Sequence, residues 1–199
     1  TMDDLYNFSK AIVKQDKKLF MIGGEHLVSY APIKALHEKY NDLRIIHFDA
    51  HTDLREDYLG EKLSHATVMK RVSDLLGPNR LYQFGIRSGL QAEFEFAKNN
   101  HYIEKFTVET VKNIIKDVKD YPVYISLDLD VLDPSIMSGT GTPEPGGVTF
   151  KELLQGLLEL KDCNIVGADI VELAPHYDQS GVSTAVAAKL IREMLLLLK

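Results

Sequence analysis

Short apolar runs alternate along the chain with longer segments in which apolar residues recur every three or four positions. The apolar runs predict strands at 19–24, 43–49, 80–86, 101–106, 122–133 and 164–173. The periodic segments predict helices at 27–39, 66–76, 90–100, 108–120, 150–161 and 184–198. A Gly/Pro/Thr loop is expected at 138–147, and Thr149 is a candidate N-cap for the helix that follows it.

Strands that alternate with helices are typical of a parallel sheet covered by helices on both faces. We therefore predict an α/β protein, a three-layer α/β/α sandwich around a central, mostly parallel sheet. The chain of 199 residues shows no internal repeat and no linker, so residues 1–199 are expected to form one domain. Open α/β sheets bind ligands at the carboxyl ends of their strands, and the residues there are the first candidates for a functional site.

The strand predicted at 43–49 ends in the segment HFDAHTDLR, which places Asp49, His51 and Asp53 at alternate positions. If the extended conformation continues, these three side chains point to one face of the sheet. Their Cα atoms would then be spaced about 6.6 Å apart, at about 3.3 Å per residue. All three residue types are metal ligands, so their convergence indicates a cation site.

A second alternating pair, Asp128 and Asp130, is expected to leave the strand predicted at 122–133 on one face. Acidic residues are depleted in strands and are rarely buried without a positively charged partner, so this pair also indicates a cation. Asp133, which precedes a proline, is expected to make a turn. His26 follows Gly-Gly-Glu at the end of another strand, and it completes a set of four aspartates and two histidines.

A ligand set rich in carboxylates, with some imidazole, suits hard divalent ions such as manganese and argues against a thiolate-type zinc site. Six ligands are too many for one four-coordinate ion, but they are enough for two ions that share carboxylates. Such a pair supplies hydroxide near neutral pH, which indicates hydrolysis or hydration at an electrophilic carbon or phosphorus. The spacing of the residues does not choose among an amide, an amidine, a guanidine and a phosphoester.

Composition narrows the classes of partner. The formal net charge of −6 and the isoelectric point near 5.6 argue against nucleic-acid binding. The longest apolar block, MLLLL near the C-terminus, is far too short to span a membrane. The one cysteine, Cys163, is expected to be a buried, reduced thiol, which fits a reducing cytoplasm.

Five segments that contain or follow these residues resemble the signatures of the ureohydrolase family, which comprises the arginases, the agmatinases and related guanidine hydrolases. The segments are GGEH (23–26), DAHTD (49–53), SLDLDVLDP (126–134), GTGTPEPGG (139–147) and DIVELAP (169–175). They occur in the order of the family, and the resemblance covers nearly the whole chain. Within the family, the sequence is most similar to the bacterial agmatinases.

The resemblance implies a binuclear manganese site with two Mn²⁺ per chain. By position, the ligands of the first ion would be His26, Asp49, Asp53 and Asp128. The ligands of the second ion would be His51, Asp49, Asp128 and Asp130. Asp49 and Asp128 would then bridge the two ions.

The resemblance also implies roles for two residues for which the local sequence alone indicates no function. His65, in the segment LSHAT, matches the family's active-site histidine and would help to protonate the leaving amine. Glu172, in the segment VELAP, matches the acidic residue that holds the guanidinium group through paired hydrogen bonds. Without the resemblance, His65 would be interpreted as a residue at a helix N-terminus, and Glu172 as a solvent-facing residue at the end of a strand. Thr142 is placed near the metals in the family, and a structural role in its turn is equally open.

The segment 54–65, LREDYLGEKLSH, bears on the substrate. It is acidic and lacks the Asn/Ser-rich character with which arginases hold the substrate's α-carboxylate, so it favours agmatine, which would give urea and putrescine. An arginase-type or guanidinobutyrase-type activity on another guanidino substrate stays open, with Arg55 and Arg87 as possible carboxylate partners. From different classes, a single-zinc deacetylase-like hydrolase and a non-catalytic subunit are the alternatives.

Two further expectations come from the family. Its members usually form homo-oligomers, either trimers or hexamers, and we expect the same of this chain. They also usually carry a substantial segment before GGEH, whereas only 22 residues precede Gly23 here. Residues 1–199 are therefore expected to be a single ureohydrolase domain without the family's N-terminal segment.

Overall fold

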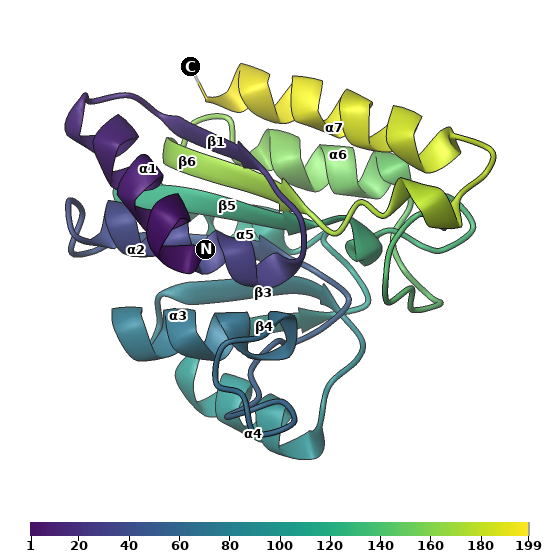
Figure 1. Cartoon of the computed structure of the whole chain (residues 1–199), viewed down its shortest axis with the longest axis horizontal. Coiled ribbons are helices and arrows are strands. Elements are labelled where there is room, and N and C mark those ends of the chain that lie inside the picture. Colours follow the sequence, from purple (N-terminus) through teal and green to yellow (C-terminus); the bar gives the residue numbers. More distant parts are fainter. Residues whose placement is uncertain (199) are drawn as a thin grey trace.

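A six-stranded parallel sheet forms the centre of the protein in the computed structural model, which describes residues 1–198 (Figure 1). The strands are β1 (Leu19–Ile22), β2 (Arg44–Phe48), β3 (Leu81–Ile86), β4 (Tyr102–Lys105), β5 (Pro122–Asp128) and β6 (Asn164–Val171). Their order in the sheet is β1-β6-β5-β2-β3-β4, and every neighbouring pair is parallel. The predicted α/β class and parallel sheet are confirmed.

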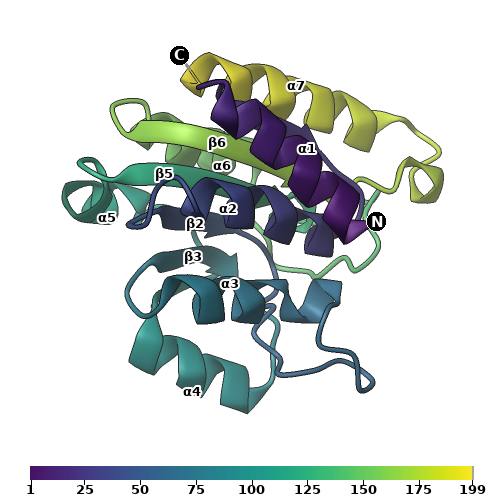
Figure 2. The same ribbon diagram turned by 60° about the vertical axis from the view of Figure 1, so that its left-hand side comes forward.

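Helices cover both faces of this sheet, as predicted. They are α1 (Met2–Lys14), α2 (Tyr30–His37), α3 (Val68–Leu76), α4 (Gln91–Asn100), α5 (Val111–Val118), α6 (Phe150–Glu159) and α7 (Val182–Leu197). Figure 2 shows α1, α2 and α3 in front of the sheet, while α6 and α7 lie behind it. Residues 1–198 also contain four short 3₁₀ helices: η1 (His26–Ser29), η2 (His65–Thr67), η3 (Leu129–Val131) and η4 (Pro175–Tyr177).

The sheet separates two apolar cores, because successive side chains of a strand point to opposite faces. In β2, Ile45 packs with residues of α1, α2 and α3, whereas Ile46 packs with residues of α5, α6 and α7. Both isoleucines are fully buried, and burial of such a side chain contributes about 1.5–3 kcal/mol. This two-sided burial explains the apolar residues of β2 and β5, among which His47 and Ser126 are buried polar exceptions.

The structure adds one helix that the sequence pattern did not predict. Helix α1 begins after Thr1, whose hydroxyl and amino groups both donate to the Asp4 carboxylate. Only Ser9 and Val13 of this helix are buried, so its apolar stripe is too thin to stand out in the sequence. Contacts with α2 hold it against the domain.

The strand predicted at 122–133 is too long. It ends at Asp128, because the Asp128 carboxylate accepts a hydrogen bond from the Asp130 N–H at 2.8 Å and turns the chain into η3. Asp128 and Asp130 therefore do not alternate along one strand, and that prediction was wrong. The extended conformation after β2 is also interrupted, because Asp53 has a positive φ of 53°.

Three smaller predictions can be compared with the structure. The Thr149 hydroxyl accepts from the Glu152 N–H at 3.3 Å, which confirms Thr149 as the N-cap of α6. Asp133 makes the expected turn, since its carboxylate accepts from the N–H groups of Ser135 and Gly146. Cys163 is only half-buried, because it lies in the turn before β6 rather than inside the strand. None of the helices within residues 1–198 has the length and apolar character needed to cross a membrane.

Candidate metal centre

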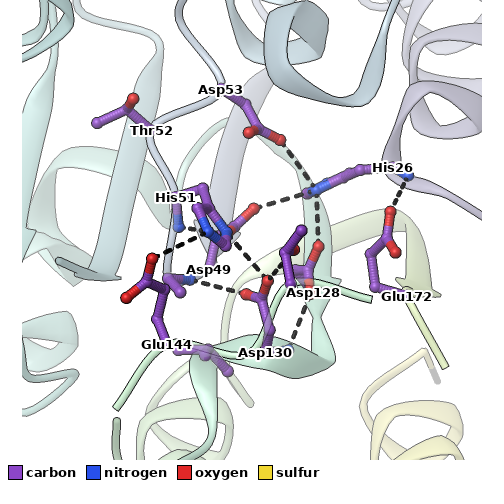
Figure 3. A network of polar contacts seen from close by, with 12 residues as sticks. His26, Asp49, His51, Thr52, Asp53, Asp128, Asp130, Glu144 and Glu172 are labelled. Carbon is purple, nitrogen blue, oxygen red and sulfur yellow. Dashed lines mark hydrogen bonds and ion pairs between the residues drawn. The ribbon is translucent and has the colours of Figure 1, made fainter. Parts of the chain in front are cut away.

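The carboxyl ends of β2 and β5, two neighbouring strands at the middle of the sheet, bring the predicted ligands together (Figure 3). Asp49 follows β2 directly, and Asp128 is the last residue of β5. His26 arrives from η1, which follows β1 on the same edge of the sheet. The six residues are distant in sequence, and the parallel topology gathers them because all these strands end at one edge.

The first group of ligands surrounds the Nδ1 atom of His26. This atom lies 3.1 Å from Asp49 Oδ2, 3.3 Å from Asp53 Oδ2 and 3.1 Å from Asp128 Oδ2. The His26 side chain is only 1% exposed, and its Nδ1 has no hydrogen-bond partner among the described residues. A buried ring nitrogen that faces three carboxylate oxygens fits a metal ion at their common focus.

The second group adjoins the first and shares Asp49 with it. His51 Nδ1 lies 3.4 Å from Asp49 Oδ1 and 3.0 Å from Asp130 Oδ2. Asp49 thus presents one oxygen to each group. All six predicted residues therefore lie in two adjoining groups of potential metal ligands.

Backbone N–H groups hold the aspartates in this arrangement. One oxygen of Asp128 accepts from the N–H of Asp130, and one oxygen of Asp130 accepts from the N–H of Ala50 at 3.0 Å. The second oxygen of each carboxylate is then directed to the centre. The His51 N–H donates to Asp49 Oδ1 at 2.5 Å, so the turn after β2 fixes this shared carboxylate as well.

Burial of so many carboxylates in one place disturbs their ionisation. Burial, together with the Asp49 charge, raises the pKa of Asp53 to about 7. Burial and the neighbouring Asp130 and Asp49 charges hold the pKa of Asp128 well above its usual range. Burial opposes protonation of His26, but the close carboxylates of Asp128, Asp49 and Asp53 outweigh it and raise the pKa of His26. The centre therefore needs positive charge, which a divalent cation supplies.

A pocket of about 210 Å³ opens onto this centre. Its lining includes His65 and Glu172 together with four of the predicted ligands, His26, His51, Asp53 and Asp128. His65 is the first residue of η2 and is exposed, and its ring packs edge-on against Tyr58 with 5.3 Å between the ring centroids. His65 is thus beside the ligand groups without belonging to them.

Glu172 follows β6 and reaches the centre through the backbone of η1. Its Oε1 accepts from the His26 N–H at 2.7 Å, as Figure 3 shows. Burial raises the pKa of Glu172, which lies in the left-handed region with φ of 65°. Such a conformation is uncommon for glutamate and is found at functional sites, where surrounding structure enforces it.

The two arginines and the threonine considered from the sequence have different surroundings. The Arg87 guanidinium donates to backbone carbonyls, among them those of Asp130 at 2.6 Å and Glu144 at 2.8 Å, and is fully engaged there. Arg55 is half-buried in the pocket wall, with its guanidinium over the Tyr58 ring. The Thr142 hydroxyl donates to Asp130 Oδ2 at 3.3 Å, which places this turn next to the second ligand group.

Two buried residues beside the centre escaped the sequence analysis. His47 donates from Nε2 to Asp49 Oδ2 at 2.8 Å, and its position two residues before Asp49 on β2 was the signal that could have revealed it. Glu93, in α4, accepts from the Thr52 hydroxyl at 2.7 Å and from the Leu54 N–H at 2.9 Å. It therefore anchors the loop that carries Asp53, and nothing local in the sequence of α4 predicted this.

The fold and the ligand groups together define a metal-binding α/β/α sandwich protein whose centre is rich in carboxylates. A sequence profile of the arginase family matches residues 1–197. The chain belongs to the arginase family, and the buried cluster supports a metal cofactor.

Several known proteins are similar to this chain. The agmatinase of Bacillus subtilis (strain 168) is 49% identical over 200 residues, which span 98% of this chain and 69% of that protein. The structure of a candidate agmatinase from Clostridium difficile matches 99% of this chain and 73% of its own, with 50% identity and a TM-score of 0.96. Proclavaminate amidino hydrolase from Streptomyces clavuligerus, at 31% identity and a TM-score of 0.91, matches 99% of this chain and 69% of its own.

Proposed function

We propose that the protein is a binuclear manganese hydrolase that cleaves the guanidinium group of agmatine to urea and putrescine. The observation that carries this proposal is the pair of ligand groups that share Asp49 at the base of a pocket. Its support from relatives is the 49% identity to the Bacillus subtilis agmatinase over nearly the whole chain. Structures of related enzymes that act on other amidino compounds share the fold, so the fold alone does not select the substrate.

The ligand set supports two Mn²⁺ per chain. His26, Asp49, Asp53 and Asp128 would hold one ion, and His51, Asp49, Asp128 and Asp130 would hold the other. Hard divalent ions prefer this mixture of carboxylate oxygens with a single imidazole at each site. The chemistry that such a pair supplies when bound is hydroxide near neutral pH.

Two further pocket residues, Glu172 and His65, would bind the substrate and protonate its leaving group. Glu172 uses Oε1 for the His26 N–H, and its carboxylate would pair with the guanidinium group and hold the reacting carbon over the ligand groups. Hydrolysis breaks the bond between that carbon and the amine nitrogen of the substrate's tail. His65, in the exposed part of the wall, would deliver a proton to this nitrogen as the amine leaves.

The loop between Arg55 and His65 favours a substrate whose tail ends in an amine. Its exposed acidic residues Glu56, Asp57 and Glu61 would repel a carboxylate and attract an ammonium group. Arg55 is the observation in favour of a second candidate, a guanidino acid such as guanidinobutyrate, because its guanidinium lies in the pocket wall. Its nearest acidic neighbour, Glu93 at 3.7 Å, partly neutralises it, and we therefore favour agmatine.

Urea release tests the proposal directly. The protein is reconstituted with Mn²⁺ and assayed with agmatine, arginine and guanidinobutyrate at equal concentrations. We expect urea and putrescine from agmatine, with kcat/KM at least tenfold higher than for the two carboxylate-bearing substrates. A preference for guanidinobutyrate would favour the second candidate, in which Arg55 binds the carboxylate of a guanidino acid. Absence of urea from all three substrates would favour a non-catalytic subunit.

Metal content and assembly are tested separately. Elemental analysis should give two manganese per chain, whereas one zinc per chain would favour a deacetylase-like site. We also propose a homo-oligomer, a trimer or hexamer, in the cytoplasm, which light scattering and cell fractionation would check. The single cysteine supports a reducing compartment.

A further inference from the structure

Four buried polar side chains form a row across the sheet, one layer beneath the metal ligands. They come from four adjacent strands: Asp169 in β6, Ser126 in β5, His47 in β2 and Gln83 in β3. The strand register pairs Asp169 with Ser126, Ser126 with His47, and His47 with Gln83. All four side chains are 0% exposed.

A polar row at this depth needs a reason, because strands buried on both faces are normally apolar. Ser126 and His47 each lie two residues before a proposed ligand, Asp128 and Asp49, and therefore on the same face of the sheet. Apolar side chains would cover that face at no cost in unpaired polar groups. The hydrogen bonds of the row show what it supports instead.

One half of the row supports His26. The Nε2 atom of His26 lies 3.0 Å from the Ser126 hydroxyl, which donates to Asp169 Oδ1 at 2.9 Å. The Tyr124 hydroxyl donates to the other oxygen, Asp169 Oδ2, at 2.7 Å. Gly167 makes room for this, because a Cβ atom there would lie 3.0 Å from Tyr124 Cδ2.

The direction of these hydrogen bonds determines which nitrogen of His26 is free. Asp169 accepts from both hydroxyls, so the proton of Ser126 points to Asp169. The Ser126 oxygen is then left to accept from His26 Nε2–H. His26 Nδ1, the atom that faces the three carboxylates, consequently carries its lone pair toward the position of the metal.

The other half of the row supports Asp49. The amide nitrogen of Gln83 lies 3.0 Å from His47 Nδ1 and 2.8 Å from the Thr52 carbonyl oxygen, and it donates to both. Since His47 Nδ1 accepts, its proton is on Nε2, which donates to Asp49 Oδ2 at 2.8 Å. Both ring nitrogens of His47 are thus engaged, and His47 acts on the metal centre through Asp49.

We propose that Asp169, Ser126, His47 and Gln83 are positioning residues that prepare His26 and Asp49 to bind metal. The Asp169–Ser126 half sets the tautomer of His26, and the Gln83–His47 half fixes the orientation of Asp49. The inference rests on the proposed function in one respect, namely that His26 and Asp49 are metal ligands. Because Asp49 is shared by the two ligand groups and His26 belongs to one, the two halves should have different effects.

Metal affinity measured without substrate tests this proposal. Mn²⁺ is titrated into the metal-free full chain, and binding is followed by calorimetry and by the EPR signal of free Mn²⁺. We expect Ser126→Ala to weaken one of two binding steps by about 10–100-fold, the range for loss of a group that orients a ligand. Gln83→Met should weaken both steps, because it loosens Asp49, a carboxylate that both proposed ions share.

Two further variants separate positioning from simple loss of packing. Asp169→Asn keeps the volume but presents an amide donor, which would turn the Ser126 proton toward His26, and we expect a loss of affinity at least equal to that of Ser126→Ala. Ile125→Val is the matched control, because Ile125 is buried on the opposite face of the same strand, in the apolar core with residues of α5, α6 and α7. It should leave both affinities within twofold of the wild type.

The outcomes are distinct. If the wild type binds no Mn²⁺, the proposed function fails, and the positioning role fails with it because His26 and Asp49 are then not ligands. If the wild type binds and folded Ser126→Ala binds within twofold of it, the positioning role is wrong. The same conclusion follows if Ile125→Val loses as much affinity as Ser126→Ala. Ser126→Ala is the smallest change in the set, so it decides the matter even if Asp169→Asn does not fold.

Discussion

Arg87 illustrates how one side chain can hold several backbone segments near the centre. Its guanidinium donates to the carbonyls of Gly85, Asp130, Val131 and Glu144. These carbonyls belong to the end of β3, to η3 and to the loop 138–147, so the arginine joins three segments around the second ligand group. A planar fork with five donors can do this, whereas a lysine ammonium cannot.

We therefore expect Arg87→Lys to lower the free energy of unfolding by at least about 2 kcal/mol, because buried carbonyls lose charged donors. Urea denaturation of the metal-free proteins measures it. Arg80→Lys is the control, since Arg80 is near the surface and donates to the carbonyl of Asn41 alone in the described structure. Equal losses from the two substitutions would contradict the joining role of Arg87.

His101 gives a prediction about pH. It is buried with its Nε2 2.8 Å from the Ser73 hydroxyl, and burial, reinforced by the Lys70 charge, lowers its pKa from 6.5 to about 4. The unfolded chain therefore binds a proton at His101 at a higher pH than the folded chain does. The contribution of neutral His101 to the free energy of unfolding is therefore fully present above about pH 6.5, and it is lost as the pH falls toward 4. At about 1.4 kcal/mol per pH unit, this contribution is about 3 kcal/mol.

Replacing this group should flatten the acid side of the stability curve. His101→Asn keeps a polar group for Ser73 but has no proton to gain, so its free energy of unfolding should fall less than that of the wild type between pH 6.5 and 4. Denaturation at a series of pH values gives both curves. Parallel curves would show that His101 titrates alike in the folded and unfolded chains.

At the scale of elements, Glu93 joins α4 to the loop that follows β2 and carries Asp53. One oxygen of this buried carboxylate accepts from Thr52 and Leu54 in the loop, and the other accepts from the Leu90 N–H at the start of its own helix at 2.7 Å. The helix end and the loop are therefore positioned by the same side chain.

Glu93→Gln should cost about 1–3 kcal/mol of stability, because an amide NH₂ group would face one of the three donors and leave it unpaired. Thermal and urea denaturation check this. Glu95→Gln, in the same helix, is the matched control, because Glu95 is exposed and its carboxylate accepts from the Gln91 side chain one turn earlier. A similarly small effect of both changes would mean that Glu93 does not join the two elements.

At the scale of the whole molecule, the metal centre links β1, β2 and β5 with their loops. Without a cation, the buried carboxyl groups of Asp49, Asp53 and Asp128 lie close together, and burial and mutual repulsion disfavour ionisation of Asp53 and Asp128. A metal that binds only the folded chain stabilises it by about 2.7 kcal/mol at 100 times its dissociation constant. For a chain of this size, each kcal/mol corresponds to about 2–4 °C in Tm.

Removal of metal with EDTA should therefore lower Tm by about 5–10 °C, and addition of Mn²⁺ should restore it. Calorimetric scans of the same sample before and after addition measure the shift. Asp49→Asn removes the shared ligand charge, so its Tm should respond weakly or not at all. A wild-type Tm that is unchanged by EDTA and Mn²⁺ would argue against a metal that stabilises the fold.

The sequence by itself determined the class of fold and the place of the site. Apolar strands that end in Asp or His, separated by amphipathic helices, are sufficient to predict a parallel sheet with ligands at its carboxyl edge. The aspartates could be found because acidic residues conflict with strand propensity, and His26 because it follows the end of another predicted strand. That conflict is local and is visible in a single segment such as HFDAHTD.

Only the tertiary structure decided how these side chains are directed. The chain turns into η3 after Asp128, and Asp53 takes a positive φ, because hydrogen bonds and neighbouring segments outweigh the strand pattern. The row from Asp169 to Gln83 likewise depends on strand register, which sequence spacing does not contain. Hydrogen-bond partners that are far apart in the chain set these directions, and so they exist only once the sheet has formed.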